Sequence, residues 1–127
     1  MQKNVILVVE DVEETRDGIE RLLKAAGYRV NSARNEQDAI SAAQRAKPDL
    51  ILLSPGAPAG LAIAKALRIR KRAGLSKTVP IMIFSVGTLP EGAQVEQRGR
   101  IYLTRPDNFD QLRQFLRRAL ESSDSAS

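Results

Sequence analysis

The sequence predicts an α/β domain in which helices cover both faces of a parallel sheet. Three observations support this prediction. Short apolar or β-branched segments alternate five times with segments that carry helix start and stop signals. Four of these five short segments are almost continuously apolar, as strands buried on both faces are. The length of 127 residues fits one ordinary domain.

Five segments are expected to be the strands of this sheet: VILVV (5–9), YRVNSA (28–33), LILL (50–53), IMIFS (81–85) and IYLT (101–104). Crossovers between parallel strands are right-handed, which leaves few topologies for such a sheet. We expect residues 1–121 to form the domain, and the polar residues 122–127 to be a flexible tail or the start of a linker.

The segments between the strands have the punctuation of helices. The first repeats apolar residues at helical spacing, namely Ile19, Leu22, Leu23 and Ala26. Gly27 follows this helix as a stop signal. The second helix is expected to begin at Asn35, a common N-cap residue, and the third to run over about 59–73 before Gly74. The last is expected to begin near Asn108.

The helical segment after the fourth strand is the weakest. VGTLPEGAQVEQRGR (86–100) contains three glycines and a proline, which disfavour a helix. We therefore expect only a short helix near residues 90–97, surrounded by a mobile loop.

The composition excludes several kinds of chemistry. The chain contains no cysteine and no histidine, which excludes disulfides, thiol nucleophiles, zinc sites of thiolate or imidazole type and a Ser-His-Asp triad. No apolar run approaches the roughly 18 to 20 residues of a membrane span, and the first apolar run is too short for a signal peptide. We therefore expect a soluble, cytoplasmic protein.

Positive charge is concentrated in the second half of the chain. The net charge is +5, and the segment AKALRIRKRAGLSK (64–77) contains six cations and no acid. This segment is interpreted either as a surface for anions or nucleic acid, or as the solvated end of a helix. The second interpretation is favoured because no aromatic residue is present in the segment to stack on bases.

Polar residues follow the ends of the expected strands. In open parallel sheets the ligand site lies beyond the carboxyl ends of the strands. The residues at these ends are Glu10, Asp11, Ser54, Ser85 and Arg105. We therefore expect the functional site to be built from these side chains.

The strand segments and the residues that flank them resemble a known family. VILVVEDVEETRDGIERLLKAAGYRV, DLILLSPGAP, PIMIFS and IYLTRP, within about 5–120, are similar to the receiver domain of two-component response regulators. The resemblance implies a flavodoxin-like fold, a doubly wound five-stranded parallel sheet in the order 2-1-3-4-5. It also implies an acidic pair that holds Mg²⁺, and an Asp at the end of the third strand that accepts a phosphoryl group from a histidine kinase. In that family a Ser or Thr ends the fourth strand, and Lys-Pro ends the fifth.

Some residues match this family pattern and others depart from it. The matching residues are Glu10, Asp11, Ser85, Pro106 and Tyr102, the last of which lies at the position of the family's aromatic switch residue. Ser54 replaces the phosphoacceptor Asp, and Arg105 replaces the Lys.

The two departures weaken the family chemistry. A hydroxyl in place of a carboxylate lowers the negative charge available to Mg²⁺, so we expect Glu10 and Asp11 to bind this ion weakly or not at all. Ser54 would need a base before it could accept a phosphoryl group, and the sequence has no histidine to serve as one. We expect the planar guanidinium of Arg105 to fork onto Glu10 and Asp11.

We therefore expect a pseudo-receiver, a non-enzymatic and phosphorylation-independent signalling module. Its partner would be a protein, such as a histidine kinase or an attached output domain. Two alternatives stay open: a phosphorelay receiver phosphorylated at or near Ser54, and a binder of anions or nucleic acid that acts through the basic third helix. A purely structural interpretation also exists, in which Ser54 is a small polar strand end and Glu10 and Asp11 are acids at a helix N-terminus.

Overall fold

A computed structural model describes residues 4–54, 59–84, 89–106 and 108–125. Its elements, in chain order, are β1 (Val5–Val9), α1 (Glu13–Ala25), β2 (Arg29–Ala33), α2 (Glu36–Arg45), β3 (Leu50–Leu53), α3 (Ala59–Arg72), β4 (Ile81–Phe84), β5 (Ala93–Gln97), β6 (Ile101–Arg105) and α4 (Phe109–Ser125). Within these described ranges, no helix is long and apolar enough to cross a membrane.

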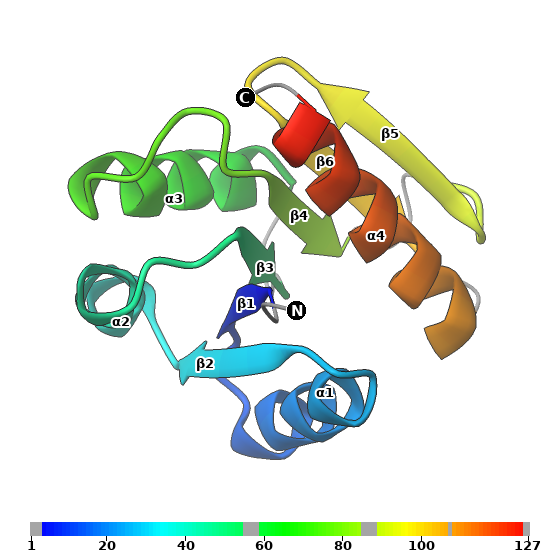
Figure 1. The fold of residues 1–127 in the computed structure, drawn as a ribbon, viewed down its shortest axis with the longest axis horizontal. Helices are drawn as coiled ribbons and strands as arrows, with labels where there is room; N and C mark the ends of the chain where they lie inside the picture. Colours follow the sequence, from blue (N-terminus) through cyan, green and yellow to red (C-terminus); the bar gives the residue numbers. More distant parts are fainter. Residues whose placement is uncertain (1–3, 55–58, 85–88, 107, 126–127) are drawn as a thin grey trace.

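The strands form one six-stranded sheet in the order β2-β1-β3-β4-β6-β5 (Figure 1). All neighbours except β5 and β6 pair in parallel, and the parallel strands have the predicted order 2-1-3-4-5 once β6 is counted as the fifth. The register places Val9 of β1 opposite Leu53 of β3, and Leu53 opposite Ile83 of β4. The carboxyl ends of these three strands therefore lie side by side, as the predicted doubly wound fold requires.

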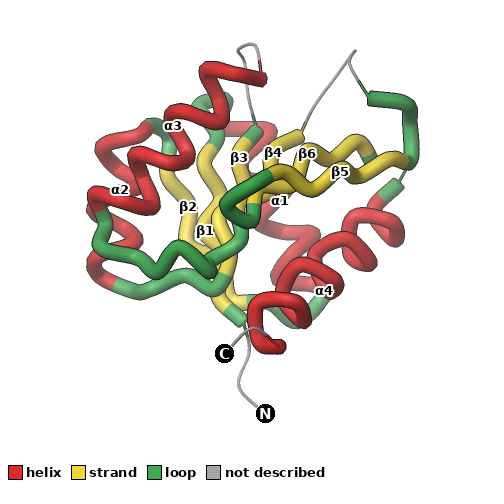
Figure 2. Tube along the Cα trace, turned by 90° about the horizontal axis from the view of Figure 1, so that it is seen from above, coloured by secondary structure: helices red, strands yellow, loops and turns green. Residues whose placement is uncertain are grey.

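Helices cover both faces of the sheet, as predicted. Figure 2 shows α2 and α3 on one side of the strands and α1 and α4 on the other. In β3, the side chain of Ile51 packs in the α2–α3 layer, whereas that of its neighbour Leu52 packs in the α1–α4 layer, and both are fully buried. The central strands are continuously apolar because successive side chains are buried on opposite faces.

Two of the predicted helix starts are confirmed by their capping bonds. The side-chain oxygen of Asn35 accepts a hydrogen bond from the backbone N–H of Asp38 at 2.8 Å. That of Asn108 accepts one from the N–H of Gln111 at 2.9 Å. Gly27 follows α1 with a φ of 99°, a left-handed value that favours glycine and ends the helix there.

The prediction of a short helix near residues 90–97 is wrong, because the structure has the antiparallel edge strand β5 in its place (Figure 1). Gly92 and Gly99 both have a φ of 82°, so the chain turns on either side of this strand. Too few residues lie between the two turns to support an isolated helix. The segment instead pairs with β6 as a strand. The hydroxyl of Thr104 in β6 adds a hydrogen bond to the side-chain oxygen of Gln94 at 2.9 Å.

A buried arginine holds the turn between β5 and β6 against α3. Arg70 is only 6% exposed, and its Nη1 donates hydrogen bonds to the carbonyls of Val79 at 3.0 Å and Gly99 at 2.6 Å. Burial lowers the pKa of Arg70, but a guanidinium keeps its proton at neutral pH. One cation of the basic segment therefore stabilises the fold instead of contributing to the surface.

Candidate functional site

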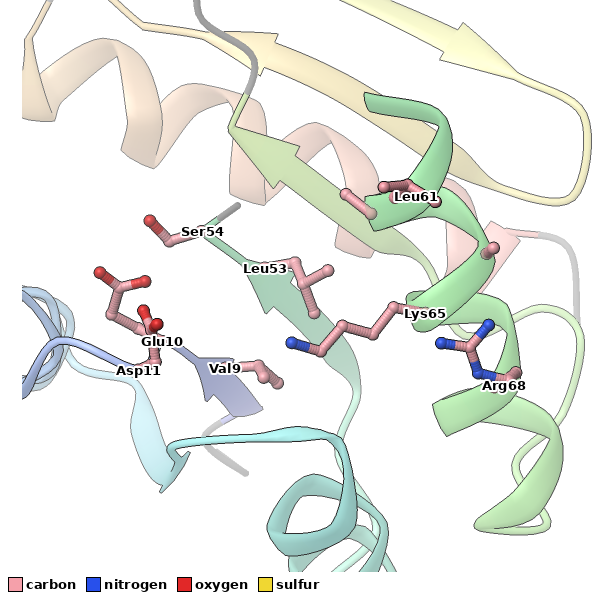
Figure 3. A pocket seen from close by; sticks show the side chains of 10 residues that line it. Val9, Glu10, Asp11, Leu53, Ser54, Leu61, Lys65 and Arg68 are labelled. Carbon is pink, nitrogen blue, oxygen red and sulfur yellow. The ribbon is translucent and has the colours of Figure 1, made fainter. Parts of the chain in front are cut away.

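The acidic pair lies where β1 ends. The N–H of Glu10 donates to the carbonyl of Ala33 in β2 at 2.9 Å, and the carbonyl of Glu10 accepts a bond from Arg16 Nη1 at 2.9 Å. Glu10 is only 7% exposed, whereas Asp11 is exposed to solvent. The Glu10 carboxyl therefore forms the inner part of the site, and Asp11 forms its rim (Figure 3).

Ser54 lies beside this pair at the end of β3. Its N–H donates to the carbonyl of Val9 at 3.1 Å, and Figure 3 shows its side chain on the side of Glu10 and Asp11. Burial raises the pKa of Glu10 above its usual 4.5, a hydrogen bond from the Ser54 hydroxyl partly lowers that pKa, and the charge of Asp11 raises it. The structure thus brings together three of the side chains that the sequence placed at strand ends.

A cleft of about 380 Å³ opens between these strand ends and the first turns of α3. Its lining residues are Val9, Glu10, Asp11, Leu53, Ser54, Leu61, Ala62, Ala64, Lys65 and Arg68. Figure 3 shows the carboxylates and Ser54 on one wall, Lys65 and Arg68 on the α3 wall, and apolar side chains between them. The cleft therefore has walls of opposite charge and an apolar floor.

Three of the five basic residues of α3 have partners within the described part of the protein. Arg68 forks onto both carboxylate oxygens of Glu36 at 2.8 and 2.9 Å, and Arg72 lies 3.9 Å from the same carboxylate. The hydrogen bond from Arg68 is the main reason that the pKa of Glu36 is lowered, and the charges of Arg68, Arg72 and Lys65 add to the effect. These contacts support the structural interpretation of the basic segment over a nucleic-acid surface.

The predicted ion pair between Arg105 and the acidic pair is wrong. Arg105 Nη1 donates to the carbonyl of Leu89 at 2.7 Å, and its Nη2 lies 3.6 Å from the carboxylate of Glu91. No contact within 4.0 Å joins Arg105 to Glu10 or Asp11, all of which belong to the described part of the chain. The reason is β5, because the chain that leads into this strand brings Leu89 and Glu91 to the end of β6.

The other residues expected at the site lie apart from the cleft or outside the described residues. Tyr102 is 4% exposed and packs in the α1–α4 layer, on the opposite side of the sheet from α3. Pro106 directly follows β6. Ser85 lies outside the residues that the structure describes.

Sequence reasoning missed the contribution of α3 to the site. Lys65 was assigned only to the basic segment, yet it lines the cleft together with Leu61 and Arg68. These residues recur at intervals of four and three, which places them on one face of a helix. That spacing was visible in the sequence, but which face of α3 lies toward β1 depends on how the helix packs on the sheet.

The residues present offer little to a metal ion. The described residues contain no group of three or more His, Cys, Asp or Glu side chains that could hold one. Glu10 and Asp11 supply two carboxylates, and Ser54 supplies only a neutral hydroxyl. Mg²⁺ usually keeps several waters and binds through one or two carboxylates together with substrate phosphates, so Glu10 and Asp11 are the side chains that would hold it.

Comparison with known proteins places this geometry in a family. Residues 6–117 match the family described as the response regulator receiver domain. The chain belongs to this family. Receiver domains are signalling modules of two-component systems, and the sheet order of this chain agrees with that fold.

Individual relatives agree with this assignment. The sensor histidine kinase AruS of Pseudomonas aeruginosa is 34% identical over 88 residues, which are 68% of this chain and 9% of AruS. The chemotaxis protein CheY4 of Vibrio cholerae has a TM-score of 0.67 at 26% identity, with 93% of this chain and 99% of that chain covered. The receiver domain of another sensor histidine kinase of Pseudomonas aeruginosa, solved with a magnesium ion coordinated in its active-site cleft, has a TM-score of 0.66 at 25% identity over 94% of this chain and 99% of that one. This chain thus corresponds to a small part of AruS and to nearly all of the two solved chains.

Proposed function

We propose that this receiver domain is a pseudo-receiver, a signalling module that works without being phosphorylated. The observation that carries the proposal is the neutral Ser54 at the end of β3, beside the acidic pair, where the family's phosphoacceptor aspartate would lie. An aspartate is ionised at neutral pH and can attack a phosphoryl group directly. A serine hydroxyl must first lose its proton to a base.

The position of Arg105 supports the same proposal. A receiver that accepts phosphate needs a cation free to meet the new phosphoryl group. The guanidinium of Arg105 is held by the Leu89 carbonyl and by Glu91, and a planar guanidinium follows a moving charge less readily than a lysine ammonium. Both departures from the family pattern therefore act against phosphoryl transfer.

We further propose that the domain acts as a non-enzymatic binding module in the cytoplasm. Its partner would be a protein, such as a histidine kinase or an output domain of a longer chain, and Mg²⁺ binding at Glu10 and Asp11 would be weak. The resemblance of this chain to a small part of a sensor histidine kinase supports such a setting.

One observation favours a second candidate function, a phosphorelay receiver that is phosphorylated at Ser54. The Ser54 hydroxyl lies on the side of the Glu10 carboxyl (Figure 3), and burial raises the pKa of that carboxyl, which makes it a better proton acceptor than an ordinary glutamate. In that case Glu10 would take the hydroxyl proton while Ser54 Oγ bonds to phosphorus and the donor's leaving group departs.

Intact-mass measurement after incubation with acetyl phosphate and Mg²⁺ separates the two candidates. The proposal predicts no phosphoryl adduct, a gain of about 80 Da, on the wild-type chain. Ser54→Ala serves as the comparison. An adduct that forms on the wild-type chain and is absent from Ser54→Ala would establish phosphorylation at Ser54 and refute the pseudo-receiver.

A further inference from the structure

The cleft between β1, β3 and α3 has two charged walls that do not meet. Glu10 and Asp11 form one wall, and Lys65 extends from α3 on the other (Figure 3). Within the described part of the chain, no carboxylate lies within 4.0 Å of the Lys65 ammonium. The lysine therefore faces the acidic wall across a gap that an ion pair does not close.

The second cation of the α3 wall is already committed. Both carboxylate oxygens of Glu36 accept hydrogen bonds from Arg68. Because this fork is bidentate, moving Arg68 toward a ligand would cost two charge-assisted hydrogen bonds. Lys65 is therefore the cation of this wall that remains available for a ligand.

The floor and lip of the cleft are apolar. Val9 and Leu53 lie between the two charged walls but are each only 2% exposed, so the accessible apolar surface belongs to Leu61, which is 65% exposed, and to the exposed Ala64. A volume of about 380 Å³ accommodates a small organic molecule. A ligand in the cleft would remove the apolar surface of Leu61 and Ala64 from water.

We propose that the cleft binds a small zwitterion with an apolar part, of the class of α-amino acids with apolar side chains. The ammonium group of the ligand would pair with Asp11 and Glu10, its carboxylate would pair with Lys65, and its side chain would cover Leu61 and Ala64. Such a ligand bridges the gap between the two walls without leaving a charge unpaired. A molecule with only one of the two charges satisfies one wall only.

The signalling role of this ligand rests on the proposed function, because it applies to a domain that works without phosphorylation. A domain that does not respond to phosphorylation needs another signal, and a ligand seated at the strand ends would supply one. Binding itself is measured independently of that role.

The isotope-labelled full chain is titrated with L-leucine and with L-phenylalanine, and binding is monitored through the amide NMR shifts. A chelator in the sample keeps metal ions away from Glu10 and Asp11. We expect saturable shifts at Val9, Ser54 and the first turns of α3, with a dissociation constant of about 1 mM or tighter. Isoamylamine lacks the carboxylate of leucine, and isocaproate lacks its ammonium group. Each should bind about tenfold or more weakly than leucine, because each loses one ion pair.

Three variants test the walls. Lys65→Met and Asp11→Asn should each weaken leucine binding about tenfold. Lys71→Met removes an exposed lysine of the same helix that does not line the cleft, so it should leave binding unchanged. The dispersion of each amide spectrum shows that the variant is folded.

The titration can give results that overturn the inference. The absence of saturable shifts with either amino acid up to about 20 mM would overturn the inference. Binding that Lys65→Met leaves intact, or that isoamylamine matches, would overturn it as well. A chain that accepts phosphate in the mass assay and also binds leucine would refute the pseudo-receiver but not the ligand site, so the two failures are distinguishable.

Discussion

At the scale of single residues, the site is governed by charge. Ser54 supplies no negative charge at the end of β3, where an aspartate would supply one. The positive charge of Arg105 lies near Glu91 and not near the acidic pair. Sequence analysis could predict the first feature, because it depends only on which residue ends the third strand. It could not predict the second, because the partner of Arg105 is set by how the chain folds before β5.

The missing carboxylate leads to a prediction about metal binding. In Ser54→Asp, a third carboxylate would crowd Glu10 and Asp11, and the repulsion would be relieved when a divalent cation binds. We expect calorimetry to show Mg²⁺ affinity at least about tenfold higher than in the wild type. In Ser54→Asn the new side chain has the size of aspartate without its charge, so this variant should not gain affinity for Mg²⁺. Equal affinities of Ser54→Asp and Ser54→Asn would show that charge is not what limits the site.

The ion pair of Glu36 with Arg68 leads to a prediction about pH. The folded protein lowers the pKa of Glu36 below 4.5, so this carboxylate stabilises the fold above that pH, and the stabilisation is lost as the pH falls through the lowered pKa. Glu36→Gln should therefore unfold at lower urea concentration than the wild type at pH 7, and the difference should shrink under acidic conditions. Asp17→Asn, at an exposed position in the middle of α1, should show no such pattern. A Glu36→Gln deficit that is equally large in acid would contradict this account.

At the scale of elements, the replacement of a helix by β5 reshapes one edge of the sheet. The strand pairs with β6 over five residues, and the buried Arg70 fixes the turn that joins the two strands. The apolar runs predicted the five parallel strands, because a strand buried on both faces has a distinctive sequence. AQVEQ has no such signal, because an edge strand is half exposed. Whether it forms also depends on its pairing with another strand, which a local sequence pattern does not reveal.

Arg70 should be a main stabiliser of this edge. In Arg70→Leu the carbonyls of Val79 and Gly99 lose their donor inside the protein, which should lower the free energy of unfolding by about 2 to 4 kcal/mol. Lys71→Leu, at the exposed neighbouring position, should change it by less than about 0.5 kcal/mol. Urea unfolding of both variants checks this. Equal stabilities would show that Arg70 does not hold the turn.

Hydrogen exchange tests the strand itself. In an antiparallel edge strand, alternate N–H groups bond to the neighbouring strand and the others face solvent. We therefore expect alternate amides of 93–97 to exchange slowly, though faster than those of β4 in the centre of the sheet. Uniformly fast exchange over 93–97 would rule out a stable β5, and a helical pattern of protection would restore the short helix predicted near residues 90–97.

At the scale of the whole molecule, the receiver fold presents a serine, Ser54, at the end of β3. Two apolar layers cover the sheet, and the strand register brings Glu10 and Ser54 together whatever residue ends β3. This is why the sequence could predict that these strand ends lie side by side. The cleft was not predictable, because the approach of Lys65 depends on the packing of α3 on the sheet and not on any local pattern.

The most direct test of the central claim is a side-by-side intact-mass measurement of the wild-type chain and Ser54→Asp after incubation with acetyl phosphate and Mg²⁺. The account predicts no phosphoryl adduct on the wild type and a slowly formed but measurable adduct of about 80 Da on Ser54→Asp, because the fold that presents the acceptor is intact while Arg105 stays held by Leu89 and Glu91. A stable adduct on the wild-type chain at a level equal to that of Ser54→Asp would contradict the account.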